Sequence, residues 1–296
     1  LPKLTPDVRR LIVLGVPGAM AAGVTQINIL VTSSIATLQE GARSWLYYAD
    51  RLYQLPLGVV GIAMGVVLLP TLSARLRAGD LPAAGNAMNR ALEISMALTL
   101  PAAAALAAIP VFIATGIYER DAFTPRDAEM VAQALIAFAA GLPAFVLIKV
   151  LSPGFFARQD TMTPMKFATA GVAINLALGL TLFFGPLGFA GLAIATSVAG
   201  WVNTLLLAVT LHRRGLFEPD ARLLNRLPRI VVASAIMAGF LLLAHQNHGW
   251  LYPWLFNSAL LVLAVVCASG LVVFALAAVL TGALRLSEVR TALKRS

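Results

Sequence analysis

The sequence predicts an all-α polytopic membrane protein, and two properties of the chain lead to that fold class. Of its 296 residues, 59% are hydrophobic and 12% are charged, about half the charged fraction of an ordinary soluble domain. Apolar runs of about 20 residues also recur along the chain, and a helix needs that length to cross a hydrocarbon core of about 30 Å. Windows such as Leu251–Leu280 carry no charge and are too long for a soluble core.

Eight membrane-spanning helices follow when apolar windows are read against proline, glycine and charged residues as breaks. They are expected at residues 10–37, 46–73, 87–116, 128–156, 164–184, 188–212, 228–246 and 253–283. The longest connection contains HRRGLFEPDARLLNRLP. Its residues 214–227 are the best candidate for a linker between a six-helix unit, residues 1–213, and a terminal helix pair with a basic tail, residues 228–296. An ordinary basic loop is an equally good interpretation of its composition.

The positive charges predict the orientation in the membrane. Eight spans place both ends on the same side, and that side receives 17 of the Lys and Arg residues, whereas the other receives Arg43, Arg120 and Arg126. Since positive residues concentrate in cytoplasmic connections, both ends are expected in the cytoplasm. The net charge of +9 lies in these short connections, so we expect no nucleic acid partner.

Nothing in the sequence predicts covalent chemistry or a metal centre. The single cysteine, Cys267, cannot form a disulfide within the chain. His245 and His248 occupy one connection without a third ligand nearby. No Cys/His cluster, phosphate-binding glycine loop or serine-nucleophile motif is present. The chain is therefore not expected to be an enzyme, and no catalytic or metal-ligating residues are assigned.

The stretch SWLYYADRLYQLP holds the first candidate site, because it places two charged residues inside a predicted span. Each such group costs about 2.5–3.5 kcal/mol at membrane depth. Helical spacing puts Arg51 on one stripe with Tyr47 and Gln54, with Asp50 on the adjoining stripe. These four residues could line a wet cavity in which the planar guanidinium binds phosphate. Alternatively, Arg51 extends to the interface and the tyrosine belongs to the aromatic belt.

A second cluster lies in KVLSPGFFARQDTMTP, at the end of the fourth predicted span. Pro153 and Gly154 break or bend that helix, and Arg158 and Asp160 enter a tight turn. Lys149 lies within the span, from where it could extend to the headgroups. The favoured interpretation is a structural turn that fixes the angle between two helices, and a functional role is the alternative.

Both stretches resemble one family. SWLYYADRLYQLPLGVVGIAMGVVLLPTLS, Ser44–Ser73, is similar to the segment that typifies the MurJ/MviN lipid II flippases, and KVLSPGFFARQDTMTP is similar to their second long motif. GVTQINILVTSSIAT and YERDAFTPRDA also fit, so the resemblance covers most of the chain. The family fold is that of the multidrug/oligosaccharidyl-lipid/polysaccharide (MOP) exporters, which have two six-helix lobes followed by two further helices.

The resemblance implies that this chain is the second lobe, family helices seven to twelve, followed by helices thirteen and fourteen, with the first lobe outside it. It implies a bacterial cytoplasmic (inner) membrane protein that moves lipid II, an undecaprenyl-pyrophosphate-linked peptidoglycan precursor, by alternating access. The partners would be lipid II, membrane lipids and the missing N-terminal lobe. The cavity arginine of the family's ADR motif maps onto Arg51, with Asp50 beside it.

Two other functions stay open at this stage. One is a related MOP-type exporter of another polyprenyl-linked glycan or of drugs. The other is a membrane-embedded glycosyltransferase, which would need an external acid as general base, with Glu119, Asp121 and Asp127 as candidates on one connection.

No cofactor is expected, although a membrane potential or an ion could drive transport. Some members of the family hold sodium in this lobe with acids on its first and fifth helices. Thr32 and Gly179 stand at those positions here. Asn175 and Thr196 alone would be weak neutral ligands, so we expect no tight Na⁺ site.

Overall fold

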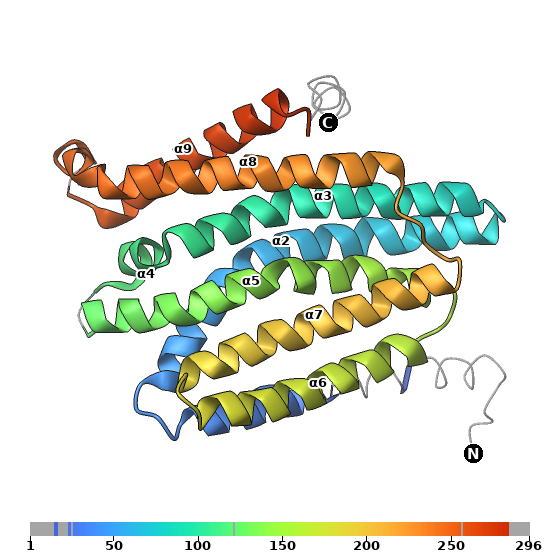
Figure 1. Cartoon of the computed structure of the whole chain (residues 1–296), viewed down its shortest axis with the longest axis horizontal. Helices are drawn as coiled ribbons and strands as arrows, with labels where there is room; N and C mark the ends of the chain where they lie inside the picture. The colour runs from blue at the N-terminus through green and yellow to red at the C-terminus, as the bar shows by residue number, and fades with distance from the viewer. Residues whose placement is uncertain (1–14, 17–22, 25, 121, 256, 284–296) are drawn as a thin grey trace, which may run out of the picture. The chain divides into compact units, whose positions relative to one another are not determined.

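The computed structural model describes residues 15–16, 23–24, 26–120, 122–255 and 257–283, which form helices and turns without any strand (Figure 1). The long helices are α2 Ala42–Arg77, α3 Leu81–Ala108, α5 Pro125–Phe156, α6 Met162–Phe183, α7 Phe189–Arg213, α8 Ala221–Gln246 and α9 Ala259–Leu280. The shorter elements are α4 Pro110–Tyr118, the 3-10 turns η1 His248–Leu251 and η2 Pro253–Leu255, and an apolar helix at Gln26–Ala36.

Seven helices, α2, α3 and α5 to α9, are long and apolar enough to cross a membrane. They confirm the predicted all-α polytopic class. The predicted span at residues 10–37 lies partly outside the described residues, and its described part includes the helix Gln26–Ala36.

The predicted helix over residues 87–116 is wrong, because the structure has two helices there. Pro110 disfavours the helical conformation at the residue before it, and Ile109 adopts φ −128° and ψ 47°. Helix α3 therefore ends at Ala108 and α4 starts at Pro110. At its other end α3 begins early, because an Asp80 carboxylate oxygen accepts a hydrogen bond from the Ala83 N–H at 3.0 Å.

Helix α8 also begins earlier than the sequence suggests. Asp220 is its N-cap, and the carboxylate accepts the Leu223 N–H at 2.6 Å. Residues 221–227, which the sequence interpretation assigned to a linker, are thus the first two turns of α8. Helix α9 starts later than predicted, at Ala259, after Ser258 as its N-cap.

The chain folds as two compact units that each draw on several segments. Unit 1 comprises Leu1–Arg43, Val59–Leu92 and Ala144–Glu218. Unit 2 comprises Ser44–Gly58, Glu93–Pro143 and Pro219–Ser296. Helices α2, α3 and α5 each contribute residues to both units.

Small residues bring the helices of each unit close together. In unit 1, α6 packs along α7, and a Cβ added at Gly191 would lie 2.6 Å from Cβ of Leu182. In unit 2, α8 packs along α9, and a Cβ added at Gly270 would lie 2.7 Å from a Leu241 methyl carbon. Larger side chains at these two glycines would separate the paired helices.

Candidate functional site

The first candidate site lies on the N-terminal part of α2, which belongs to unit 2. One face of this segment is buried in the unit through Trp45, Ala49 and Leu52. The opposite face carries Tyr47 and Arg51, which are exposed on the chain. The polar stripe predicted from helical spacing is therefore the side of α2 that unit 2 does not cover.

The structure brings the four predicted residues together in two pairs. The guanidinium carbon of Arg51 lies 4.8 Å from the centroid of the Tyr47 ring, which is a cation–π contact one helical turn apart. The Gln54 side-chain amide donates a hydrogen bond to the Asp50 carboxylate. Among the described residues, no carboxylate lies within ion-pair distance of Arg51. The guanidinium edge can therefore donate to an anionic group from outside the unit.

An aromatic cluster fixes this end of α2 in unit 2. The Tyr48 ring centroid lies 4.7 Å from that of Tyr118 and 5.5 Å from that of Phe123. The Trp45 indole N–H donates to an Asp127 carboxylate oxygen at 2.7 Å. These contacts hold one face of α2 against unit 2. The opposite face, which carries Tyr47 and Arg51, is therefore the exposed one.

Asp127 is committed to helix capping, which weakens it as a general base. Its second carboxylate oxygen accepts two hydrogen bonds from Thr124, one from the backbone N–H at 2.9 Å and one from the side-chain hydroxyl at 2.6 Å. In return, the backbone N–H of Asp127 donates a hydrogen bond to the Thr124 hydroxyl. This reciprocal pair begins α5. Glu119 is exposed at the end of α4, and Asp121 lies outside the described residues.

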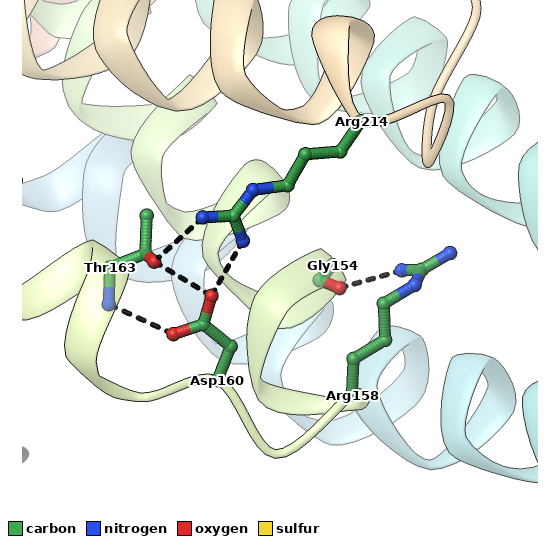
Figure 2. A network of polar contacts seen from close by, with 5 residues as sticks. All are labelled: Gly154, Arg158, Asp160, Thr163 and Arg214. Carbon is green, nitrogen blue, oxygen red and sulfur yellow. Dashed lines mark hydrogen bonds and ion pairs between the residues drawn. The ribbon is translucent and has the colours of Figure 1, made fainter.

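The second candidate site is a polar network in unit 1 that joins the end of α5, the start of α6 and the end of α7 (Figure 2). Asp160 accepts the Thr163 N–H at 2.9 Å and the Thr163 hydroxyl at 2.7 Å, and it forms an ion pair with Arg214 at 2.7 Å. Arg158 donates to the carbonyl oxygen of Gly154 at 2.6 Å and to that of Leu216 at 3.4 Å. These contacts make a structural brace between three helix ends.

The remaining predicted residues of this motif also pack within unit 1. Pro153 lies within α5, which continues to Phe156 without a break at the predicted position. Gly154 leaves room for Met88 and Leu211, since an added Cβ would approach them to 3.0 and 3.3 Å. The exposed Lys149 side chain lies against α2 at Gly61. A Cβ added at Gly61 would lie only 2.8 Å from Cδ of Lys149. Gly61 therefore provides the space that the aliphatic part of this lysine occupies.

Folding lowers the pKa of Asp160. Partial burial raises the pKa, but the hydrogen bonds from Thr163 and the ion pair with Arg214 outweigh it. The ionised carboxylate therefore stabilises the fold above the unfolded pKa of about 3.9, and this contribution is lost as the pH falls through the lower folded pKa.

We expect Asp160→Ala to lower the free energy of unfolding by about 1–2 kcal/mol, because it removes a helix cap together with an ion pair. Denaturant unfolding of the purified protein at pH 7 measures the loss. As the pH falls below the unfolded pKa of about 3.9, the variant should lose less stability than the unaltered protein. An unchanged acid response would contradict the role of this carboxylate.

A third group of polar side chains links three helices of unit 1. The Asn175 side-chain amide on α6 donates to the side-chain oxygen of Asn28 at 2.9 Å, and the Thr196 hydroxyl on α7 donates to the side-chain oxygen of Asn175 at 3.2 Å. Near Gly179, the side chains that an added Cβ would meet are Leu192 and Ala195. This group is neutral and its amides bind one another, so it fits a cation poorly.

Sequence reasoning missed a buried ion pair in unit 2. Glu93 on α3 contacts Arg226 on α8, and both side chains are less than 10% exposed. Arg222, one turn earlier on α8, also contacts Glu93 at 3.2 Å. The two arginines had been counted only as topology signals. The sequence does contain a signal for this pair, because Glu93 is an isolated acid inside the apolar run ALEISMALTL. An acid in such a run is expected to have a polar or charged partner in the protein interior.

Similar folds define the class of protein. A solved structure titled "Lipid II flippase MurJ, inward closed conformation" matches with a TM-score of 0.74 and 25% sequence identity, over 93% of this chain and 56% of that chain. A MOP superfamily transporter from Pyrococcus furiosus shares the fold, with a TM-score of 0.59 and 16% identity over 90% of this chain and 61% of its own. The architecture is thus that of MOP superfamily transporters.

Sequence comparison then defines the family. The family model "Lipid II flippase MurJ" matches residues 2–265. A probable lipid II flippase MurJ of Rhizobium meliloti is 49% identical over 99% of this chain and 55% of its own length. One of Vibrio cholerae is 33% identical over 97% of this chain and 54% of its own. This chain belongs to the MurJ family.

The chain spans about half the length of the curated relatives it matches. Its family and its seven apolar helices make it a multi-pass protein of the cytoplasmic membrane. The predicted family and fold class are therefore confirmed.

Proposed function

We propose that this chain forms one half of a transporter that moves lipid II from the inner to the outer leaflet of the cytoplasmic membrane. Family membership supports the proposal. The observation that carries it is the exposed guanidinium of Arg51 on a membrane-spanning helix, in cation–π contact with Tyr47 and without an ion-pair partner among the described residues. An uncompensated charge in a span is costly, so its presence favours an anionic ligand.

The ligand group that suits this arginine is a diphosphate. Its oxygens lose water when the headgroup enters a cavity, and charge-assisted hydrogen bonds from a guanidinium offset that loss. Asp50 forms no ion pair with Arg51, and its carboxylate accepts a hydrogen bond from Gln54. Binding and release require no bond to be made or broken, so the chain works as a transporter rather than as an enzyme.

Translocation would follow an alternating-access cycle. We propose that a second six-helix lobe, corresponding to sequence that the longer relatives carry outside the match, completes the cavity. Rocking of one lobe against the other would expose the headgroup first to the cytoplasm and then to the outside. Membrane lipids would surround the polyprenyl tail throughout. In this proposal residues 1–213 form the lobe, the linker ends at Asp220, and α8 and α9 form the terminal pair.

The proposed orientation places both ends of the chain in the cytoplasm. Its support is the excess of Lys and Arg in the connections on that side. The Asp160–Arg214 brace would then lie at the cytoplasmic end of unit 1. Fusing a reporter that is active only in the cytoplasm to the C-terminus tests this topology, and an inactive fusion that is nevertheless inserted would contradict it.

We further propose that transport needs no tightly bound sodium. The neutral contacts among Asn28, Asn175 and Thr196 support this, since hard cations prefer carboxylate oxygens. Replacing KCl by NaCl at constant ionic strength should leave the thermal unfolding midpoint of the full-length protein unchanged. A ligand that binds the folded state raises that midpoint, so a sodium-specific rise would contradict the proposal.

The direct test of function is the accessibility of labelled lipid II at the outer face of cells depleted of their own flippase. The full-length protein should restore that accessibility. The rival function, export of another polyprenyl-linked glycan or of drugs, is supported only by the likeness of fold to other MOP transporters. Failure to restore accessibility by a protein that inserts normally would favour the rival.

A further inference from the structure

We propose that Tyr47 is a positioning residue for diphosphate recognition, whose ring holds the guanidinium of Arg51 by its flat face and leaves the N–H edge available to the substrate. The inference rests on the proposed function, in which Arg51 binds the diphosphate of a polyprenyl-linked headgroup. It assigns Tyr47 a role that acts through the arginine rather than through the substrate.

The geometry of the contact allows Tyr47 and a phosphate group to bind different parts of the Arg51 guanidinium. The guanidinium carbon lies 4.8 Å from the Tyr47 ring centroid, on the same helical face and one turn away. A guanidinium that stacks flat on a ring uses its face, whereas bidentate binding of phosphate uses its edge. The two interactions can therefore exist at once. An ion pair with a carboxylate would instead occupy the edge that the substrate needs.

A neighbouring aromatic cluster supports the Tyr47 ring. Tyr47 contacts Tyr48 edge to face at 6.1 Å, and Tyr48 packs against Tyr118 and Phe123 in unit 2, where all three rings are half-buried. The Tyr118 hydroxyl also lies 3.4 Å from the Tyr48 carbonyl oxygen. Tyr47 nevertheless remains 53% exposed. A supported ring that presents half its surface outward is suited to carry another group.

Stacking also reduces the entropy lost on binding. A free arginine side chain has many rotamers and loses most of them when it binds a ligand. An arginine that already contacts a ring has fewer rotamers to lose. Gln54 contributes indirectly, because its side-chain amide holds one carboxylate oxygen of Asp50, next to the arginine, by a hydrogen bond. Tyr47 and Gln54 together keep the guanidinium oriented and its edge unoccupied.

The test measures diphosphate affinity of the full-length protein in lipid nanodiscs by calorimetric titration with geranyl diphosphate. We expect Tyr47→Leu to weaken binding about fivefold, the equivalent of an exposed cation–π contact, and Tyr47→Phe to stay within about twofold because the ring face remains. Arg51→Ala should weaken binding more than either. Trp254→Leu, which removes an exposed aromatic ring elsewhere in unit 2, is the matched control and should bind as the unaltered protein does.

Fluorinated phenylalanines at position 47 separate stacking from mere bulk. Fluorine withdraws charge from the ring face, so affinity should fall with each added fluorine. The role of Tyr47 would be overturned if the affinity did not change with the number of fluorine atoms. It would also be overturned if Tyr47→Leu bound normally while Arg51→Ala lost affinity. Either result would leave the proposed function intact. Unchanged binding by Arg51→Ala would overturn both.

Discussion

Arg51→Ala should lower the affinity for a polyprenyl diphosphate by about a hundredfold or more and fail to support growth of cells that lack their own flippase. A hydrogen bond to a charged group contributes about 1.5–3 kcal/mol, and a bidentate contact makes two of them. Because Arg51 is exposed and makes no ion pair among the described residues, its removal should leave the fold intact. Titration with geranyl diphosphate and growth of the depleted strain measure the two losses.

Arg51→Lys is the matched control for charge. It keeps a cation but loses the planar fork, so we expect partial retention of function at best. Both variants should insert in the membrane and unfold at the same temperature as the unaltered protein. Full growth supported by Arg51→Ala at ordinary expression would contradict the assignment of Arg51 to substrate binding.

The largest expected effect on stability is at the buried contact between Glu93 and Arg226. Glu93→Leu leaves the Arg226 guanidinium buried without this carboxylate, which typically costs about 3–5 kcal/mol. Arg226→Leu should cost less, because Arg222 still contacts the Glu93 carboxylate at 3.2 Å. Denaturant unfolding in detergent measures both, and Glu119→Ala, which removes an exposed acid on the same unit, should change the free energy of unfolding by less than about 0.5 kcal/mol.

The double variant Glu93→Leu with Arg226→Leu tests the cause of the loss. If the loss caused by Glu93→Leu comes from separating the buried Arg226 charge from this carboxylate, replacing both partners by apolar residues should recover most of the stability. Single variants as stable as Glu119→Ala would show that the two charges do not depend on each other. Additive losses in the double variant would also contradict the coupling.

The sequence was sufficient for the fold class because the apolar runs are long and their charge breaks are clear. It failed where one residue decides a local backbone conformation. Pro110 ends α3 at Ala108, two residues before the proline, although the apolar pattern continues, and Asp220 starts α8 within a segment that looks like a linker. A hydropathy window averages over such single residues, so it misses proline breaks and helix caps.

The contacts of the candidate sites could also be predicted only in part. Helical spacing correctly placed Tyr47 and Arg51 on one face of α2, because residues four apart are always neighbours on a helix. Partners that are distant in the sequence could not be predicted. Glu93 meets Arg226 across 133 residues, and Asp160 meets Arg214 across 54. Such pairs depend on how helices pack, which periodicity does not determine.

The measurement that tests the central claim most directly is the water accessibility of position 51. In a full-length protein with Cys267→Ser, Arg51→Cys should react with a membrane-impermeant thiol reagent nearly as fast as Glu119→Cys, which reports an exposed position outside the helices. Val272→Cys, on the apolar outer face of α9, should remain unlabelled. If Arg51→Cys is as unreactive as Val272→Cys in inserted, folded protein, then α2 turns this position toward lipid and cannot offer a cation to a diphosphate there.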